Sequence, residues 1–174
     1  KIANLKGMSD RLSKDLRAED IQWMLDAVPN KHNGLTFCAG SFSAGEHNDC
    51  VAMAKQFADR THFVHLRSCY IFPNGNFTEA SHLGGRGHLI ELCRIFEKAE
   101  QEGKCNSGRR LPMRVDHGMT FTDEPGGVFD ESNHGHNAGY TLLGRMFAMG
   151  QIQGVIATVD DELGIEYKQP GFYD

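Results

Sequence analysis

The sequence predicts an α/β fold built around a parallel β-sheet. Amphipathic segments alternate strictly with short apolar segments along the chain. Such alternation makes successive strands parallel, because each helix carries the chain back across the sheet before the next strand. The chain has 174 residues, of which 40% are hydrophobic, and this is enough to bury one sizeable core. We therefore expect residues 1–174 to form a single domain.

Four segments have the helical spacing, with apolar residues at positions i, i+3, i+4 and i+7. The first carries Ile21, Met24, Leu25 and Val28, and it ends at Pro29. The expected helices are 18–28, 50–58, 89 to about 101, and 142–152. Each is followed by a short apolar segment that we interpret as a strand. The expected strands are 35–38, 62–67, 111–116 and 155–159.

Long loops are expected over 68–87 and 119–138. Two architectures fit the alternation: an open doubly wound sheet, and part of a (β/α)8 TIM barrel. No glycine-rich phosphate-binding motif follows any expected strand, which weakens the case for a nucleotide-binding open sheet. A complete barrel takes about 250 residues, so four strand–helix units would make about half of one.

Composition excludes several classes of partner. The formal charge is −5, from 18 basic and 23 acidic residues, and no basic cluster stands out, which argues against nucleic acid or an anionic membrane as the main partner. No apolar run approaches the roughly 20 residues that span a bilayer, so we expect no membrane segment. Five cysteines without a CxxC pair favour free thiols and a cytoplasmic protein over a disulfide framework.

Chemistry-bearing residues follow three successive strands. Cys38 ends the first strand, His65 lies near the end of the second, and Asp116 ends the third. The carboxyl ends of parallel strands meet at one edge of the sheet, so these side chains can converge. Each residue alone has an ordinary alternative, as a small core thiol, a satisfied buried histidine or a turn cap. Together, a thiol, an imidazole and a carboxylate form a metal-ligand set.

A divalent cation beside an imidazole suits the removal of a proton next to a carboxylate. The resulting enolate-like intermediate needs positive charge where its negative charge develops. Arg67 lies two residues after His65, on the same side of its strand, and could hold a substrate carboxylate as a fork. The alternative for Arg67 is an ordinary surface position.

Five linked motifs, between about Asp20 and Val159, resemble the mannonate dehydratase family in order and approximate spacing. They are Cys38-Ala39-Gly40-Ser41, His62-Phe63-Val64-His65-Leu66-Arg67, Phe77-Thr78-Glu79-Ala80-Ser81-His82-Leu83-Gly84-Gly85, Pro112-Met113-Arg114-Val115-Asp116-His117-Gly118, and Asn137-Ala138-Gly139-Tyr140 followed by Gly144-Arg145. The resemblance implies a TIM barrel that dehydrates D-mannonate to 2-keto-3-deoxy-D-gluconate in hexuronate (glucuronate) breakdown. It also implies manganese, or iron in some members, where a thiol and an imidazole alone would suggest zinc.

The resemblance implies a role for seven residues. They are Cys38, His65 and Asp116 as metal ligands, His117 and Tyr140 as the acid–base pair, and Arg67 and His82 in the substrate pocket. The chain departs from the family at Val115 and Ala138, where proline is usual, and in a longer segment over 119–136.

The chain is similar to the C-terminal half of the enzyme, and the family's remaining histidine ligand lies upstream of the matching region. We therefore expect the 174-residue chain to be inactive if it is all that is present. We also expect a homo-oligomer, a dimer. The alternatives are a metal-dependent TIM-barrel sugar isomerase and a half-barrel without activity.

Overall fold

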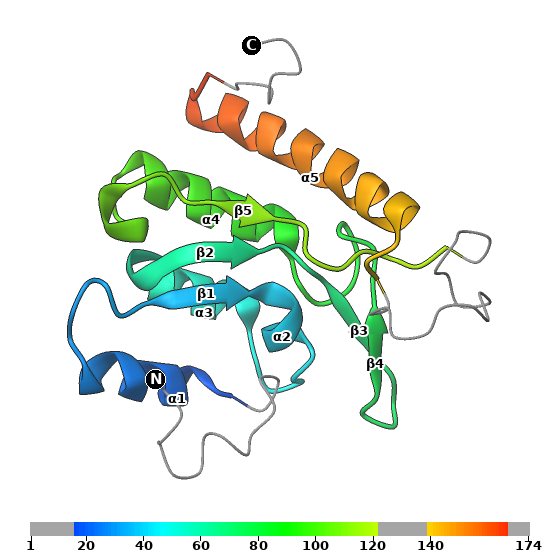
Figure 1. The fold of residues 1–174 in the computed structure, drawn as a ribbon, viewed down its shortest axis with the longest axis horizontal. Coiled ribbons are helices and arrows are strands. Elements are labelled where there is room, and N and C mark those ends of the chain that lie inside the picture. Colours follow the sequence, from blue (N-terminus) through cyan, green and yellow to red (C-terminus); the bar gives the residue numbers. More distant parts are fainter. Residues whose placement is uncertain (1–15, 122–138, 167–174) are drawn as a thin grey trace.

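A three-stranded parallel sheet forms the centre of the molecule (Figure 1). The computed structural model describes residues 16–121 and 139–166. The strands are β1 (Leu35–Cys38), β2 (Thr61–His65) and β5 (Met113–Arg114), in the order β1-β2-β5. Both neighbouring pairs are parallel, which confirms the α/β class and the parallel sheet. The third strand is shorter than the six residues expected from the sequence.

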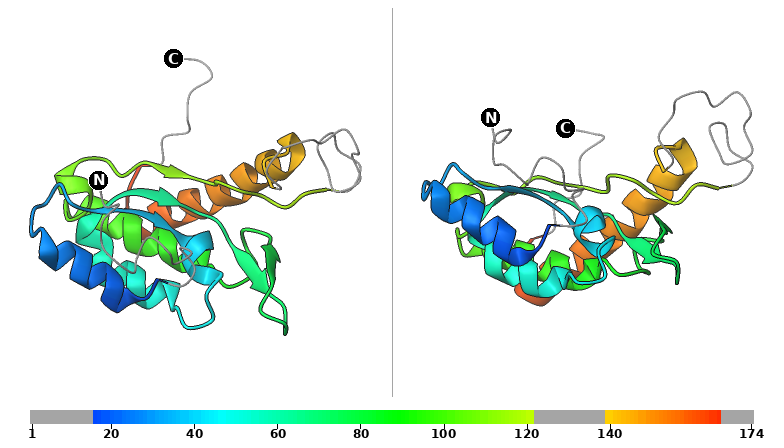
Figure 2. Two further views of the ribbon diagram at one scale, coloured as in Figure 1. Left: turned by 60° about the horizontal axis from the view of Figure 1, so that its bottom comes forward. Right: turned by 90° about the horizontal axis from the view of Figure 1, so that it is seen from below.

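Helices cover one face of this sheet (Figure 2). They are α1 (Ala18–Ala27), α3 (Cys50–Phe57), α4 (Leu89–Gln101) and α5 (Leu142–Leu163), with the short helices α2 (Ala39–Ser43), η2 (Ala58–Arg60) and η3 (Asn106–Gly108) in the connections. The apolar stripes of α1, α3 and α4 face the sheet. Phe37 of β1 and Phe96 of α4, for example, are fully buried and meet edge to face, with ring centroids 5.3 Å apart. The stripe expected for α5 is wrong in its first half, because Leu142, Leu143, Met146 and Met149 are exposed and only Ile152 is buried.

The fourth expected strand, 155–159, is wrong: these residues continue α5. The β-branched run around Val155 and Ile156 suggested a strand, but its apolar positions extend the stripe of the preceding helix. Ala148, Ile152 and Val159 are buried and recur at intervals of four and seven residues, as one helix face requires. The helix ends at Gly164, whose φ of 68° provides a left-handed C-cap. The described residues therefore form three parallel strands, not four.

The expected loop over 68–87 contains an antiparallel hairpin. Its strands are β3 (Cys69–Ile71) and β4 (Phe77–Glu79), and it projects beyond the carboxyl ends of the sheet (Figure 1). The turn between them includes Gly75 at a φ of 81°, a backbone conformation that favours glycine. Strands of three residues are too short for a clear alternating pattern, which is why the sequence did not reveal them. Residues 122–138 of the second expected loop lie outside the described residues.

Helix α5 is long and apolar enough to cross a membrane by length and composition alone, with a mean hydropathy of 1.2 over its most apolar window. Its C-terminal half, however, packs against α4. Arg94 of α4 forms a bidentate ion pair with Glu162 of α5, so this half belongs to the helical layer. The expectation that no segment spans a membrane, like that of a single domain over residues 1–174, stays a prediction.

Candidate metal and acid–base site

Cys38 and His65 lie side by side because the register of the sheet pairs them directly. Successive side chains of a strand point to opposite faces. Phe37 and Val64 are fully buried toward the helices, so the next residue of each strand turns to the other face. β5 pairs Arg114 with His65, and Asp116 follows two residues later. The parallel register thus brings three polar side chains to one edge of the sheet.

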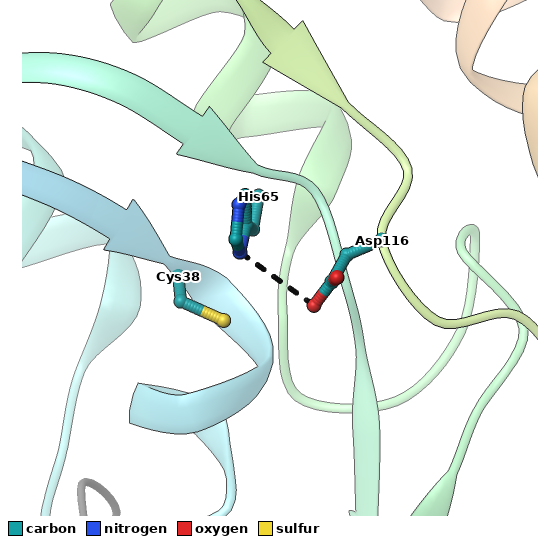
Figure 3. A group of neighbouring side chains, drawn as sticks. All are labelled: Cys38, His65 and Asp116. Carbon is teal, nitrogen blue, oxygen red and sulfur yellow. Dashed lines mark ion pairs between the residues drawn. The ribbon is translucent and has the colours of Figure 1, made fainter. Parts of the chain in front are cut away.

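The ligand atoms of Cys38, His65 and Asp116 all lie within 4.8 Å of one another, and the side chains face a common space (Figure 3). His65 Nδ1 is 3.6 Å from Asp116 Oδ2. Ligands of one divalent ion, each about 2.0–2.3 Å from it, are on the order of 3–4.5 Å apart. A thiolate, an imidazole and a carboxylate at this spacing fit a transition-metal ion such as manganese or iron. The role of the three residues as ligands stays a prediction.

Asp116 occupies an unusual backbone conformation, with a φ of 57°. Aspartate tolerates this left-handed region better than most residues, and backbone strain of this kind is concentrated at functional sites. Its carboxylate is well satisfied: Oδ1 accepts hydrogen bonds from the Arg114 guanidinium and, at 2.7 Å, from the Tyr140 hydroxyl. Arg114 also donates to the Tyr140 oxygen at 2.8 Å. Asp116 is therefore held in place from the side opposite His65.

The protonation states suit metal binding. Burial lowers the pKa of His65 and outweighs the attraction of Asp116. Burial opposes the charge of Asp116, but the hydrogen bonds from Tyr140 and Arg114, with the nearby histidines, outweigh it and lower the pKa of the carboxyl. At neutral pH the pair is thus a neutral imidazole and a carboxylate, the two forms that coordinate metals.

His117 and Tyr140 lie against each other, with ring centroids 4.3 Å apart. The backbone holds them together, because Gly118 N–H donates to Gly139 O at 2.8 Å. Gly139 has a φ of 89°, and a Cβ there would lie 2.8 Å from Gly118 O and 3.0 Å from His117 Cβ. Only glycine fits this contact without displacement. The predicted acid–base pair is thus assembled from segments 23 residues apart, beside Asp116.

Arg67 makes a different contact from the one expected. Its guanidinium forms a bidentate ion pair with Glu79 of β4, with Nε donating to Oε2 at 2.8 Å and Nη2 to Oε1. Burial opposes the charge of Arg67, but the hydrogen bond and charge of Glu79 outweigh it, so the pKa of Arg67 rises above its ordinary value. Its binding of a substrate carboxylate stays a prediction.

His82 lies beneath the site, only 2% exposed. One ring nitrogen, Nε2, is 2.9 Å from Val115 O, the residue before Asp116. Burial lowers the pKa of His82 and outweighs hydrogen bonds to the backbone of Val115 and Leu66. Those two residues adjoin Asp116 and His65, so His82 braces the ends of β2 and β5. Its expected contact with substrate stays a prediction.

Two residues of the site were given no role from the sequence. Glu79 contacts Arg67 and approaches His117, with Oε1 at 3.6 Å from Nδ1. Arg114 contacts both Asp116 and Tyr140. Both lie inside the motifs described above. They could have been found from the sequence by asking which charged residues pair with Arg67 and with Asp116.

Comparison with known proteins gives a consistent result. Residues 10–165 match the family model described as D-mannonate dehydratase (UxuA). The chain belongs to the D-mannonate dehydratase (UxuA) family. It is 38% identical to mannonate dehydratase 2 of Agrobacterium fabrum over 146 residues. These residues are 83% of this chain and 35% of that relative. It is 38% identical over 145 residues to mannonate dehydratase of Saccharophagus degradans, covering 82% of this chain and 35% of the relative.

A solved structure, the mannonate dehydratase from Streptococcus suis serotype 2, has the same fold, with a TM-score of 0.67 at 20% sequence identity. The likeness covers 90% of this chain and 42% of that one. The chain thus spans about a third of the length of the curated members of the mannonate dehydratase family that it matches. The match includes every residue of the candidate site, because all of them fall within residues 10–165.

Proposed function

We propose that the protein is a metal-dependent hydro-lyase that eliminates water from D-mannonate to give 2-keto-3-deoxy-D-gluconate in glucuronate catabolism. One observation carries this proposal: the candidate ligand set and the candidate acid–base pair meet at Asp116. Its Oδ2 faces His65 and its Oδ1 accepts from Tyr140. Membership of the mannonate dehydratase family supports the choice of substrate.

Cys38, His65 and Asp116 would hold Mn²⁺, or Fe²⁺ as an alternative. When bound, the ion would supply positive charge where negative charge develops as the C2 proton leaves. The choice of manganese over zinc rests on the family, since the donor set alone accepts either metal.

His117 takes the proton from C2 of the substrate, and Tyr140 gives its hydroxyl proton to the 3-hydroxyl as that group leaves as water. The C2–H and C3–O bonds break, and the enol that remains rearranges to the 2-keto acid. Burial and the hydrogen bond to Asp116 raise the pKa of Tyr140, so the phenol keeps its proton at neutral pH and has one to donate. A neutral imidazole has an unprotonated ring nitrogen that can accept a proton.

We also propose that the sheet is one part of a (β/α)8 barrel. Its helices lie on one face (Figure 2), while Phe63 on the opposite face is only half-buried, as expected for a residue that other barrel strands would cover. A cytoplasmic location agrees with all five cysteines being free thiols. The remaining elements of this proposal are a small sugar-acid substrate and a homodimer.

The test joins metal analysis to a keto-acid assay on D-mannonate. The full-length wild-type protein that carries residues 1–174 should retain about one manganese per chain and form the keto acid, whereas residues 1–174 alone are expected to be inactive. His65→Asn should lose metal and activity, because an imidazole ligand is removed. His62→Asn is the matched control: it lies on the same strand, near the opposite end, with Nε2 at 3.0 Å from Lys31 O, and should retain both. Metal retention in His65→Asn, or an isomerised sugar without loss of water, would contradict the proposal.

A further inference from the structure

The hairpin β3–β4 contributes one charged group to the site, the carboxylate of Glu79 at the end of β4. It is held between two basic residues. Arg67 donates hydrogen bonds to both of its oxygens, and His117 Nδ1 lies 3.6 Å from Oε1. All three side chains are largely buried, with exposed fractions of 13% for Arg67, 14% for Glu79 and 20% for His117. Solvent therefore screens these charges only weakly.

Arg67 is itself immobilised. A Cβ on Gly40 would collide with the Cγ and Cδ atoms of Arg67, so the arginine stem lies directly on the backbone of α2. The guanidinium fork then fixes the plane of the Glu79 carboxylate. Oε1 can accept from both Arg67 and His117, because each carboxylate oxygen has two lone-pair sites.

We propose that Glu79 is a positioning residue that accepts a hydrogen bond from His117 Nδ1–H and thereby leaves Nε2 as the proton acceptor. Its catalytic consequence rests on the proposed function above. A carboxylate beside one ring nitrogen selects the tautomer that carries the proton there. The distance of 3.6 Å between His117 Nδ1 and Glu79 Oε1 is a few tenths of an ångström longer than a hydrogen bond, and hydrogen bonds between catalytic groups are often this long in structures without substrate. Tyr140 packs against the same ring and limits its rotation.

The first test reads the tautomer directly. Nitrogen-15 NMR of the wild-type chain at pH 8, with the His117 signals identified by their absence in His117→Asn, should show the proton on Nδ1. Glu79→Gln should shift the tautomer population, because a neutral amide is a weaker acceptor than a carboxylate. Glu162→Gln is the matched control, since it removes another bidentate arginine–glutamate pair far from His117. A proton on Nε2 in the wild-type protein overturns the proposal, and this measurement needs no variant to fold.

The second test is kinetic and uses the manganese-loaded protein. Glu79→Gln should lower kcat by about 10- to 100-fold, the range for residues that orient an active group, with KM changed by less than about threefold and metal content unchanged. In a His117→Asn background the same change should have less than about a twofold effect, because residues that act as a unit are not additive. A full loss in both backgrounds would mean that Glu79 acts by another route.

The two proposals fail in different ways. If the full-length wild-type protein that carries residues 1–174 forms no keto acid from D-mannonate when loaded with manganese, the proposed function is wrong. The tautomer of His117, and its response to Glu79→Gln, still decides whether Glu79 positions the ring.

Discussion

Removing the charge of Glu97 should stabilise the protein at alkaline pH. Glu97 lies on α4, in a cavity of about 470 Å³ between α4, β5 and α5. Burial first, and then the charges of Asp160 and Glu100, raise its pKa from 4.5 to about 7, while Arg110 opposes this. The folded protein therefore holds a proton on Glu97 that the unfolded chain has already released.

The sign of the effect follows from proton linkage. Between pH 4.5 and about 7 the folded state binds more protons at this group, so raising the pH lowers the free energy of unfolding. This rise in pKa can lower the free energy of unfolding by at most about 3 kcal/mol, since each pKa unit is worth about 1.4 kcal/mol. Glu97 is only half-buried, and solvent screening reduces the expected effect to about 1 kcal/mol. For a chain of this size that corresponds to about 2–4 °C in Tm.

Urea unfolding at pH 5 and at pH 8 measures the effect. Glu97→Gln should be about 1 kcal/mol more stable than wild type at pH 8 and closer to it at pH 5, where Glu97 of the folded wild-type protein is also neutral. Glu19→Gln on the exposed side of α1 is the control and should follow the wild type at both values. If the free energy of unfolding changed by the same amount between pH 5 and pH 8 in wild type and in Glu97→Gln, the reasoning would be refuted.

Two further predictions concern the site and its support. His117→Asn and Tyr140→Phe should each lower turnover on D-mannonate by about 100-fold or more with metal retained, because each removes one proton-transfer group; near-normal rates in both would refute the assignment. Gly144→Ala should cost about 2 kcal/mol or more in urea unfolding and lower activity, since the new Cβ would collide with Met119 O beside the site. Gly150→Ala on the same helix meets nothing within 4 Å and should stabilise the protein by up to about 1 kcal/mol. Equal gains from both variants would show that helix propensity alone governs these positions of α5.

The fold could be predicted from the sequence where one periodic signal dominated. The first three helices and the parallel order of β1, β2 and β5 agree with the expectation to within a few residues. The prediction of a strand at residues 155–159 was wrong because two signals conflict there. The β-branched composition favours a strand, whereas the spacing of Ile152, Ile156 and Val159 favours a helix. Packing against α4 decides in favour of the helix, and packing cannot be read from local composition.

The positions of the predicted ligands could be anticipated because topology alone brings parallel strand ends together. Cys38, His65 and Asp116 indeed lie within 4.8 Å of one another. The partner of Arg67 could not be anticipated, because it depends on a hairpin whose strands have three residues each. Glu79 reaches Arg67 because the antiparallel pairing of the hairpin places Glu79 opposite Cys69, two residues after Arg67. No periodic pattern reports such a contact.

Asp116 links the proposed metal site to the proposed acid. One oxygen faces the proposed ligand His65, and the other accepts from Tyr140 and Arg114. Any change in the charge felt by this carboxylate, including the arrival of a cation, alters the strength of its hydrogen bond from the phenol. The positive φ of Asp116 directs the carboxylate between the two groups, and that gives the strained backbone a use. The site is therefore one connected unit, in which the carboxylate proposed to hold the metal also accepts the hydrogen bond of the proposed acid.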